Sequence, residues 1–414
     1  MRRSRLACVA LLAGACGPGP AAAPPPIRFL HTFGAAETEL FNAAMAERGI
    51  AVAPARVPPA RGPQVIGELL SAGDDCPDLI RIDATWLPAF VAGDLLLPVP
   101  EALARLDWTP EAAALGGGHS VPQAIDGLVV ARDRARPAPA SASITDLALA
   151  ARAASTPGSQ HPLGLRADGY WFVPWLRAEG GELSPDGIAG DGALRALGAF
   201  AALFGDVAPR PPPAGDEAPD EAPGEALGEA PDEAPGELRR WRAQKLAYWI
   251  AEPWQLGAPS GRDRLAVSAL ARAPRGGQLL AVPRCARRPD DGWRLARELT
   301  EVAVAVRFAE RLGTVPTRQA ALAQAPPLVG DVYRALQAGE PLPRSPLTPL
   351  LFDDLNPALA AAVAHDATAE EAIAGVRRGW KRLARAAAPA APAAPAAAAP
   401  AERAAPAPAP GGAP

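Results

Sequence analysis

The sequence is poor in lysine, in aromatic residues and in charge of one sign. Lys245 and Lys381 are its two lysines, and aromatic residues make up 5% of the 414 positions. The other basic residues are arginines, which we interpret as codon bias, and the formal net charge is only −4. The absence of a basic excess predicts no nucleic-acid partner. Beyond the N-terminus no apolar run approaches the roughly 18 residues of a membrane-spanning helix.

Proline is abundant instead, and it clusters. The 50 prolines are more than twice the usual share. Residues 207–237 repeat a short Asp/Glu-Ala-Pro-Gly unit without apolar periodicity, which predicts an acidic, disordered surface insertion. A Ca²⁺ site is not expected there, because Pro and Ala replace the oxygen ligands. Residues 387–414 form an Ala/Pro-rich tail that we also expect to be disordered.

The N-terminus has the pattern of an export signal. Arg2, Arg3 and Arg5 precede the apolar stretch from Leu6 to Leu12, and Ala13-Gly14-Ala15-Cys16 resembles a bacterial lipoprotein cleavage site. We therefore expect residues 1–15 to be a signal peptide, Cys16 to be lipidated and residues 16–26 to be a tether. The alternative is a plain secretory signal with a chance cysteine. In both cases the mature protein works outside the cytoplasm, and in the first it is lipid-anchored to the membrane, facing the periplasm or the cell exterior.

Few cysteines remain after export. Cys8 leaves with the signal and Cys16 is the anchor, so Cys76 and Cys285 are left as a pair in an oxidising compartment. Compartment and parity favour a disulfide between them. No metal is expected, because neither cysteine has a Cys or His at ligand spacing. A disulfide would close a loop of about 200 residues and would require the two segments to be neighbours.

The first part of the chain alternates strands and helices. The pattern predicts strands at 27–33, 50–57 and 77–84 and helices at 37–49 and 63–73. Such alternation is typical of βαβ units on a parallel sheet, in which ligands bind beyond the carboxyl ends of the strands. Asp83 and Trp86 lie at one of these ends.

The rest of the chain is less regular. At 414 residues it is too long for one ordinary hydrophobic core and suits two lobes with tails. We expect a strand at 127–133, two strands at 266–274 and 276–289 joined by a glycine turn, and helices at 144–155, 169–183, 191–206, 290–313 and 367–386. The segment 237–257 is expected to hold a helix and then a strand.

Six sequence pieces in order resemble a known family. They are HTFGAAETELFNAAMAERG, GDDCPDLIRIDATWLPAFVAGDLLLPV, VPQAIDGLVVAR, QKLAYWIAEPWQL, GTVPTRQAAL and ATAEEAIAGVRRGWKRL. Together they resemble the bacterial extracellular solute-binding proteins of carbohydrate ABC importers, family 1. The IDATW and VPTR pieces look most like its trehalose/maltose-binding branch.

The resemblance implies an α/β, two-lobe, periplasmic-binding-protein-like fold of type II, with hinge strands crossing between the lobes. Lobe 1 would comprise residues 27–125 and 276–325, and lobe 2 residues 126–275 and 326–385. It implies a monomer that uses no cofactor, is not an enzyme, binds a di- or oligosaccharide and delivers it to ABC transporter permease subunits.

A sugar site needs aromatic rings for the C–H faces and charged groups for paired hydroxyls. By the resemblance, Asp83 is the candidate for hydroxyl binding, Trp249 for stacking and Arg318 for a further ligand contact. Further candidates from residue type and position are Glu37, Trp86, Trp171 and Trp254.

Each candidate has a structural alternative. Trp86 could belong to the core, and Trp171 and Trp175 share a helix face, which more often means packing. Asp83 could cap a helix, and Glu37 could stabilise a helix first turn. Arg318 could pair with a surface carboxylate.

The chain also departs from the family pattern. SASITDL stands where a Tyr and a Trp are usual, and the acidic insertion replaces an ordinary loop. A sensor or scaffold lipoprotein of the same fold therefore stays open. An extracellular hydrolase has less support, because the four histidines are scattered and no nucleophile motif is present.

Overall fold

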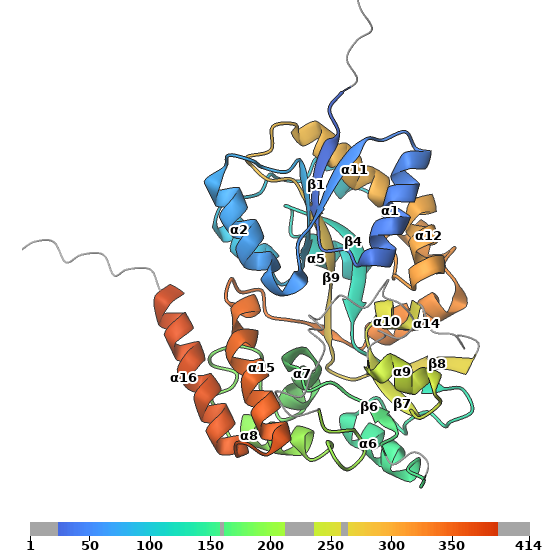
Figure 1. The fold of residues 1–414 in the computed structure, drawn as a ribbon, viewed down its shortest axis with the longest axis vertical. Coiled ribbons are helices and arrows are strands. Elements are labelled where there is room, and N and C mark those ends of the chain that lie inside the picture. Colours follow the sequence, from blue (N-terminus) through green and yellow to red (C-terminus); the bar gives the residue numbers. More distant parts are fainter. Residues whose placement is uncertain (1–23, 158–160, 212–235, 258–263, 388–414) are drawn as a thin grey trace, which may run out of the picture.

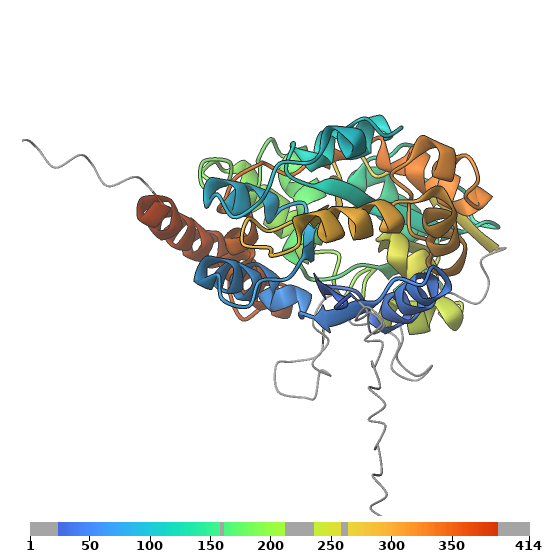
Figure 2. The same cartoon turned by 90° about the horizontal axis from the view of Figure 1, so that it is seen from above.

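The computed structural model describes residues 24–157, 161–211, 236–257 and 264–387. The predicted signal peptide, Cys16 and most of the tether lie outside these ranges, as do residues 212–235 of the predicted insertion and 388–414 of the tail. Figure 1 shows two lobes, each built around its own β-sheet. Figures 1 and 2 place α16 (Ala369–Ala387) at one edge of the molecule and α12 (Val302–Leu312) at the opposite edge.

The first lobe contains the larger sheet. Its strand order is β10-β9-β3-β1-β2, and β4 also pairs with β9. The strands are β1 (Ile27–His31), β2 (Val52–Arg56), β3 (Leu79–Asp83), β4 (Val121–Gly127), β9 (Pro274–Ala281) and β10 (Glu340–Pro341). β1 pairs in parallel with β2 and β3, as the alternating pattern predicted. Four of the five residues of β3, LIRID, are buried, which is typical of a strand that is covered on both faces of its sheet.

Helices complete the first lobe. They are α1 (Ala35–Glu47), α2 (Gly62–Ala72) after the short turn η1 (Pro59–Arg61), α3 (Leu87–Ala92), α4 (Glu101–Ala104), α5 (Pro110–Gly116), α11 (Pro289–Leu299), α12 and α13 (Gln319–Leu322). Cys76 and Cys285 form a disulfide with a Cα–Cα distance of 5.8 Å and a sequence separation of 209. It joins the segment before β3 to the segment after β9.

Two long strands lead from one lobe to the other. β4 pairs antiparallel with β9 from Val121 to Gly127, with a register shift at Gln123, and only Leu128 separates β4 from β5 (Val129–Asp133) of the second sheet. Gly127 has φ +148°, and a Cβ there would lie 2.6 Å from the Pro274 carbonyl oxygen. Glycine is therefore required where the strand changes sheets.

The second lobe holds a sheet of order β6-β7-β5-β8. Its other strands are β6 (Leu163–Gly164), β7 (Tyr248–Ala251) and β8 (Leu265–Ser268). The helices near it are α6 (Ile144–Ala153), α7 (Gly169–Ala178), α8 (Gly192–Ala201), α9 (Gly236–Arg242), α10 (Pro253–Gly257), α14 (Pro327–Leu336), α15 (Thr348–Ala364) and α16. One apolar cluster unites β5, β7, α7, α8, α15 and α16, so the last two helices pack on this lobe.

Three expectations from the sequence differ from the structure. Residues 290–313 are two helices, because the Thr300 hydroxyl donates to the carbonyls of Ala296 and Arg297 and Glu301 is extended at φ −61°, ψ 140°. The expected glycine turn at 276 lies inside β9, where Gly276 and Gly277 pair with Asp126 and Ile125 of β4. Glycine is required at 277 for close approach, because a Cβ there would meet the Ala124 carbonyl oxygen at 2.2 Å.

The third difference concerns the start of the acidic segment. Val207 and Ala208 are fully buried in the core of the second lobe, although the repeat pattern assigned them to the insertion.

Candidate functional site

Carboxylates from both lobes lie where the two sheets approach each other. Asp83 ends β3, Asp126 lies one residue before the crossing glycine, and Glu252 follows β7 directly. Asp83 pairs with Gln278 and Asp126 with Gly276 on β9. Residues two apart on a strand point to one side, so both aspartates lie on the same face of the sheet.

We call the following residues the charged cluster. Its members are Glu37, Arg81, Asp83, Asp126, Arg166, Asp168, Tyr170, Glu252 and Trp254.

In the first lobe the charged cluster is tied by hydrogen bonds. Arg81 is 5% exposed, and its guanidinium donates to Gln123 Oε1 at 3.0 Å, to Thr32 Oγ1 at 2.8 Å and to Glu37 Oε1 at 3.2 Å. It also lies 4.5 Å from the centre of the Phe33 ring. Glu37 accepts a further bond from the Gly34 N–H at 3.0 Å, which closes a capping box on α1. Glu37 therefore has both the expected helix-start role and an ion pair.

Asp83 is held by its own turn. Its Oδ1 accepts from the Thr85 N–H at 2.8 Å and the Thr85 hydroxyl at 2.6 Å, and its Oδ2 accepts from Gln278 Nε2 at 3.3 Å. Such an Asx turn fixes the exit of β3 toward α3. The side chain remains half-buried, so a ligand can still reach it.

The second lobe contributes Trp254, Asp168 and Tyr170. Trp254 Nε1 donates to Glu252 Oε2 at 3.0 Å, and Asp168 caps α7 by accepting from the Tyr170 N–H at 2.8 Å. The Tyr170 hydroxyl lies 3.5 Å from the Pro274 carbonyl oxygen and about 4.0 Å from where a Cβ of Gly276 would be. Gly276 is the partner of Asp126, so Tyr170 reaches from the second lobe to the crossing strands beside that carboxylate.

Burial and mutual repulsion change the protonation of these groups. Burial and the nearby Asp83 raise the pKa of Asp126 to about 7. Burial and Asp126 raise the pKa of Glu252 well above its ordinary value. Burial also raises the pKa of Asp83, of Asp168 and of the Tyr170 hydroxyl. The Asp126 carboxyl group of the crossing strand thus acts on the Glu252 carboxyl group of the second lobe.

The other predicted site residues lie elsewhere. Trp249 is fully buried among the apolar side chains around β5 and β7, and its ring is 6.4 Å from that of Trp241. Trp86 is 7% exposed and packs on Gly62 at the start of α2. Arg318 pairs with Asp107 and lies 5.9 Å from the Trp108 ring, and neither partner belongs to the charged cluster.

Trp171 lies behind the charged cluster. It is 3% exposed, its Nε1 donates to the Ile250 carbonyl at 2.9 Å, and the Arg166 guanidinium lies 4.7 Å from its ring centre. Trp171 therefore positions Arg166. Its neighbour on the helix face, Trp175, is buried in the same core.

Sequence reasoning missed Asp126, Glu252 and Tyr170. Each lay in a quoted piece of sequence or directly beside an aromatic candidate. The available signal was position: Asp126 precedes the glycine of a strand that changes sheets, and Glu252 ends a buried strand beside Trp254.

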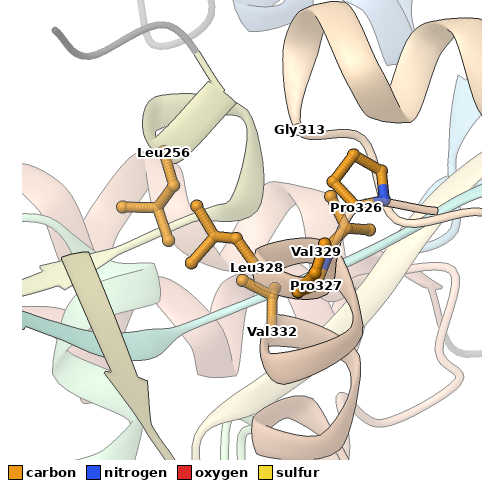
Figure 3. A pocket seen from close by; sticks show the side chains of 7 residues that line it. All are labelled: Leu256, Gly313, Pro326, Pro327, Leu328, Val329 and Val332. Carbon is orange, nitrogen blue, oxygen red and sulfur yellow. The ribbon is translucent and has the colours of Figure 1, made fainter. Parts of the chain in front are cut away.

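An apolar pocket lies outside the charged cluster. It encloses about 220 Å³ between α10 and α14 and is lined by Leu256, Gly313, Pro326, Pro327, Leu328, Val329 and Val332 (Figure 3). A sugar needs hydroxyl partners, and these side chains offer none. We therefore place the candidate site at the charged cluster and not in this pocket.

The described residues contain no group of three or more His, Cys, Asp or Glu side chains arranged to hold a metal ion. In the same residues no helix is both long and apolar enough to cross a membrane.

Comparison with known proteins finds similarity in structure. No protein-family model matches the chain, and no curated protein matches it. The GacH receptor of Streptomyces glaucescens GLA.O, solved unliganded and with acarbose, is 21% identical with a TM-score of 0.70, over 87% of this chain and 98% of that one. The maltose/maltodextrin-binding domain MalE of Bdellovibrio bacteriovorus, bound to maltotriose, is 14% identical with a TM-score of 0.71, over 87% and 100%.

A third similar structure is maltose-bound T. maritima MalE3, with 17% identity and a TM-score of 0.69 over 86% of this chain and 100% of that one. At these identities the likeness shows the fold. The chain has the α/β, two-lobe, periplasmic-binding-protein-like fold that the sequence predicted.

Proposed function

We propose that this chain is an extracytoplasmic solute-binding protein that captures a carbohydrate between its lobes at the charged cluster. The observation that carries the proposal is the meeting of carboxylates from both lobes, Asp83 and Asp126 on one side and Glu252 on the other, beside Trp254 and Tyr170. Carboxylates accept from paired hydroxyls, and aromatic rings cover the C–H faces of a sugar.

Binding at this place would close the lobes. A ligand that contacts Asp83 in the first lobe and Glu252 in the second stabilises the arrangement in which both contacts exist, because only that arrangement provides the full set of bonds. The strands β4 and β9 would carry the movement, since they lead from one lobe to the other.

Delivery to an ABC importer and attachment of the mature chain to the membrane through Cys16 complete the proposal. The names of the similar structures support it, because they describe binding proteins for maltose, maltotriose and acarbose. The trehalose/maltose branch remains a prediction from the IDATW and VPTR pieces. A ligand-sensing lipoprotein is the second candidate, and a permease gene beside this one would favour import over it.

A ligand panel tests capture. Purified mature protein is heated with mono-, di- and trisaccharides at millimolar concentration. A ligand at a hundredfold excess over its Kd adds about 2.7 kcal/mol to the free energy of unfolding and raises the melting temperature. No shift with any sugar would reject the proposal. Small-angle scattering with a positive sugar should show a smaller radius of gyration.

A further inference from the structure

The end of the second sheet that lies opposite the crossing strands is strongly basic. β5 starts one residue after β4 and ends at Asp133, and the chain then turns through further arginines. The cations at this end of the lobe are exposed or half-buried, and we call them the basic face. Its members are Arg132, Arg134, Arg136, Arg239, Arg240, Arg242, Lys245 and Arg264.

Hydrogen bonds bring the arginines around β5 together. β5 pairs with β7 on one side and with β8 on the other, and the Arg132 guanidinium donates to the Arg136 carbonyl oxygen at 2.7 Å. The Arg134 N–H donates to the Arg264 carbonyl oxygen at 2.6 Å. The residues after β5 and the residue before β8 therefore lie side by side.

The end of α9 and the residues after it join the same end of the lobe. The Arg240 guanidinium donates to the His161 carbonyl oxygen, and the Lys245 N–H donates to the Arg240 carbonyl oxygen at 2.9 Å. The Asp133 N–H lies 3.4 Å from the Ala247 carbonyl oxygen, to which it donates. The chain that follows α9 thus runs beside the end of β5.

The basic face has little negative charge of its own. Within residues 132–136, 239–245 and 264, Asp133 is the acidic residue, and its Oδ1 accepts from the Ala135 N–H at 2.9 Å. In the part of the chain that the structure describes, five arginines of the basic face have no carboxylate partner: Arg132, Arg134, Arg136, Arg242 and Arg264. The buried Nε atoms of Arg132 and Arg242 have no hydrogen-bond acceptor there. Clustered cations of this kind attract a polyanion.

An acidic segment of the same chain begins and ends beside the basic face. Residues 212–235 contain eight carboxylates and no basic residue. Before this segment, the Val207 carbonyl oxygen accepts from the N–H of Leu163 on β6, the strand next to β7. After it, α9 begins at Gly236 and carries three arginines of the basic face.

We propose that residues 212–235 bind the basic face of their own chain through ion pairs between their carboxylates and its arginines. Because both ends of the segment are attached beside this surface, its effective concentration there is on the order of millimolar. Single ion pairs at an exposed surface contribute little. The carboxylates recur at intervals of about four residues, so several can meet cations at the same time.

A membrane is the rival partner, because anionic headgroups also attract clustered arginines. The expected lipid tether enters the first lobe at β1, whereas the basic face lies at the ends of β5, β7 and β8 in the second lobe. Figure 1 places β1 in the upper lobe and β7 in the lower one. An anchor at Cys16 therefore gives no advantage to contact between the basic face and the membrane.

The inference is independent of the proposed sugar site. Arg132 pairs with Tyr248 at one end of β7, and Val129 pairs with Ala251 at the other end, which precedes Glu252 of the charged cluster. The basic face and the charged cluster thus lie at opposite ends of the same two strands. Loss of the acidic segment should leave sugar affinity unchanged.

The two lysines of the chain make a cross-linking experiment specific. A carbodiimide couples a lysine amine to a carboxylate in contact with it. Lys245 belongs to the basic face, and Lys381, exposed on α16, is the internal control. In the full mature protein at about 20 mM salt, tandem mass spectrometry should find at least fivefold more coupling of Lys245 than of Lys381 to the first five carboxylates of the segment. These are Asp216, Glu217, Asp220, Glu221 and Glu225.

Salt separates ion pairing from mere tethering. The carboxylates nearest to α9 are not counted, because they are close to Lys245 in sequence. About 0.5 M salt should lower the Lys245 coupling at least threefold, since it screens the ion pairs. Equal coupling at the two lysines, or coupling that salt leaves unchanged, would overturn the inference.

Matched variants test the arginines. Arg134→Gln/Arg136→Gln changes two exposed members of the basic face and should reduce the Lys245 coupling at least threefold. Arg378→Gln/Arg385→Gln is the control, because it removes the same charge from exposed positions on α16 and should leave the coupling unchanged. Unchanged coupling in the first variant, or an equal loss in both, would contradict the inference.

Arginine reactivity is an independent readout. Residues 212–235 are replaced by a Gly/Ser chain of equal length, and both proteins are treated with phenylglyoxal. Arg134 and Arg136 should be modified at least threefold faster in the Gly/Ser variant than in the wild type, and Arg378 at an equal rate. Equal rates at Arg134 and Arg136 in the two proteins would overturn the inference.

Vesicles decide between the acidic segment and a membrane. The mature chain with Cys16→Ser is sedimented with phosphatidylglycerol vesicles, with and without the Gly/Ser replacement. We expect at least fivefold more binding after the replacement, because the acidic segment competes with the lipid for the arginines. Strong and equal binding of both proteins would assign the basic face to a membrane and reject the inference.

Discussion

The two halves of the charged cluster differ in how far the protein itself satisfies them. In the first lobe, Arg81 donates hydrogen bonds to Glu37 and to Thr32. Glu37 and Asp83 each also accept a hydrogen bond from a backbone N–H group. On the crossing strand and in the second lobe, the side chains of Asp126 and Glu252 each accept one hydrogen bond from the described residues. The comparison teaches that the first half maintains the shape of the site, whereas the second half keeps carboxylate oxygens available to a ligand.

The largest expected effect on stability comes from the first-lobe half of the charged cluster, whose side chains have protein hydrogen-bond partners. Arg81→Met removes a buried guanidinium from the partly buried Glu37 and the buried Thr32, and we expect the free energy of unfolding to fall by about 3 kcal/mol. Urea denaturation at pH 7 measures it. Arg105→Met is the matched control: Arg105 and Glu101 form an exposed pair on α4, and their loss should change stability by less than about 0.5 kcal/mol. If the two variants lost similar stability, Arg81 would not have the structural role that we assign to the first-lobe half of the charged cluster.

Asp83→Ala should destabilise less. It leaves the Thr85 N–H and the Gln278 amide without their acceptor, for which we expect a loss of about 1–2 kcal/mol. Thermal unfolding without ligand measures the loss. An unchanged melting temperature would show that Asp83 belongs with Asp126 in the ligand-facing half.

Asp126→Asn should stabilise the free protein at alkaline pH. The pKa of Asp126 is raised to about 7, so between its ordinary value and 7 the folded state binds more protons than the unfolded state. Wild-type stability contributed by this group therefore falls as the pH rises through that window. We expect the variant to be more stable by about 1 kcal/mol at pH 8, after discounting for screening of a half-exposed group, and equal at pH 4. Urea titrations at both pH values measure it, and a variant less stable at pH 8 would contradict the assignment.

The smallest effect is expected at Arg318. Its partner Asp107 is partly exposed and does not belong to the charged cluster, so Arg318→Gln should cost less than about 1 kcal/mol and change sugar affinity less than twofold. Calorimetric titration measures the affinity. A tenfold loss of sugar affinity in this variant would support the ligand-facing role of Arg318 that the VPTR piece suggested.

The sequence predicted the fold well because its signals are local. Alternation of strands and helices over residues 27–84 places β1 to β3 in parallel order, and the ordered family pieces imply two lobes. It failed at Thr300, where one hydroxyl ends a helix inside a periodic pattern, and at Gly277, where a neighbouring strand requires glycine.

The site was harder to predict because it depends on contacts distant in sequence. Asp83 and Glu37 could be selected from strand and helix ends, and both lie in the charged cluster. Trp249 looked like a ligand residue by motif, but which face of β7 is buried depends on α9 and α14. The interaction of Asp126 with Glu252 depends on the crossing of β4 and has no local signature.

The most direct test of the central claim is a calorimetric titration of wild type and Asp126→Asn with whichever saccharide raises the melting temperature most. Site-specific capture predicts one molecule bound per chain by the wild type and at least tenfold weaker binding by the folded variant. Identical binding by both proteins would contradict the placement of the site at the charged cluster.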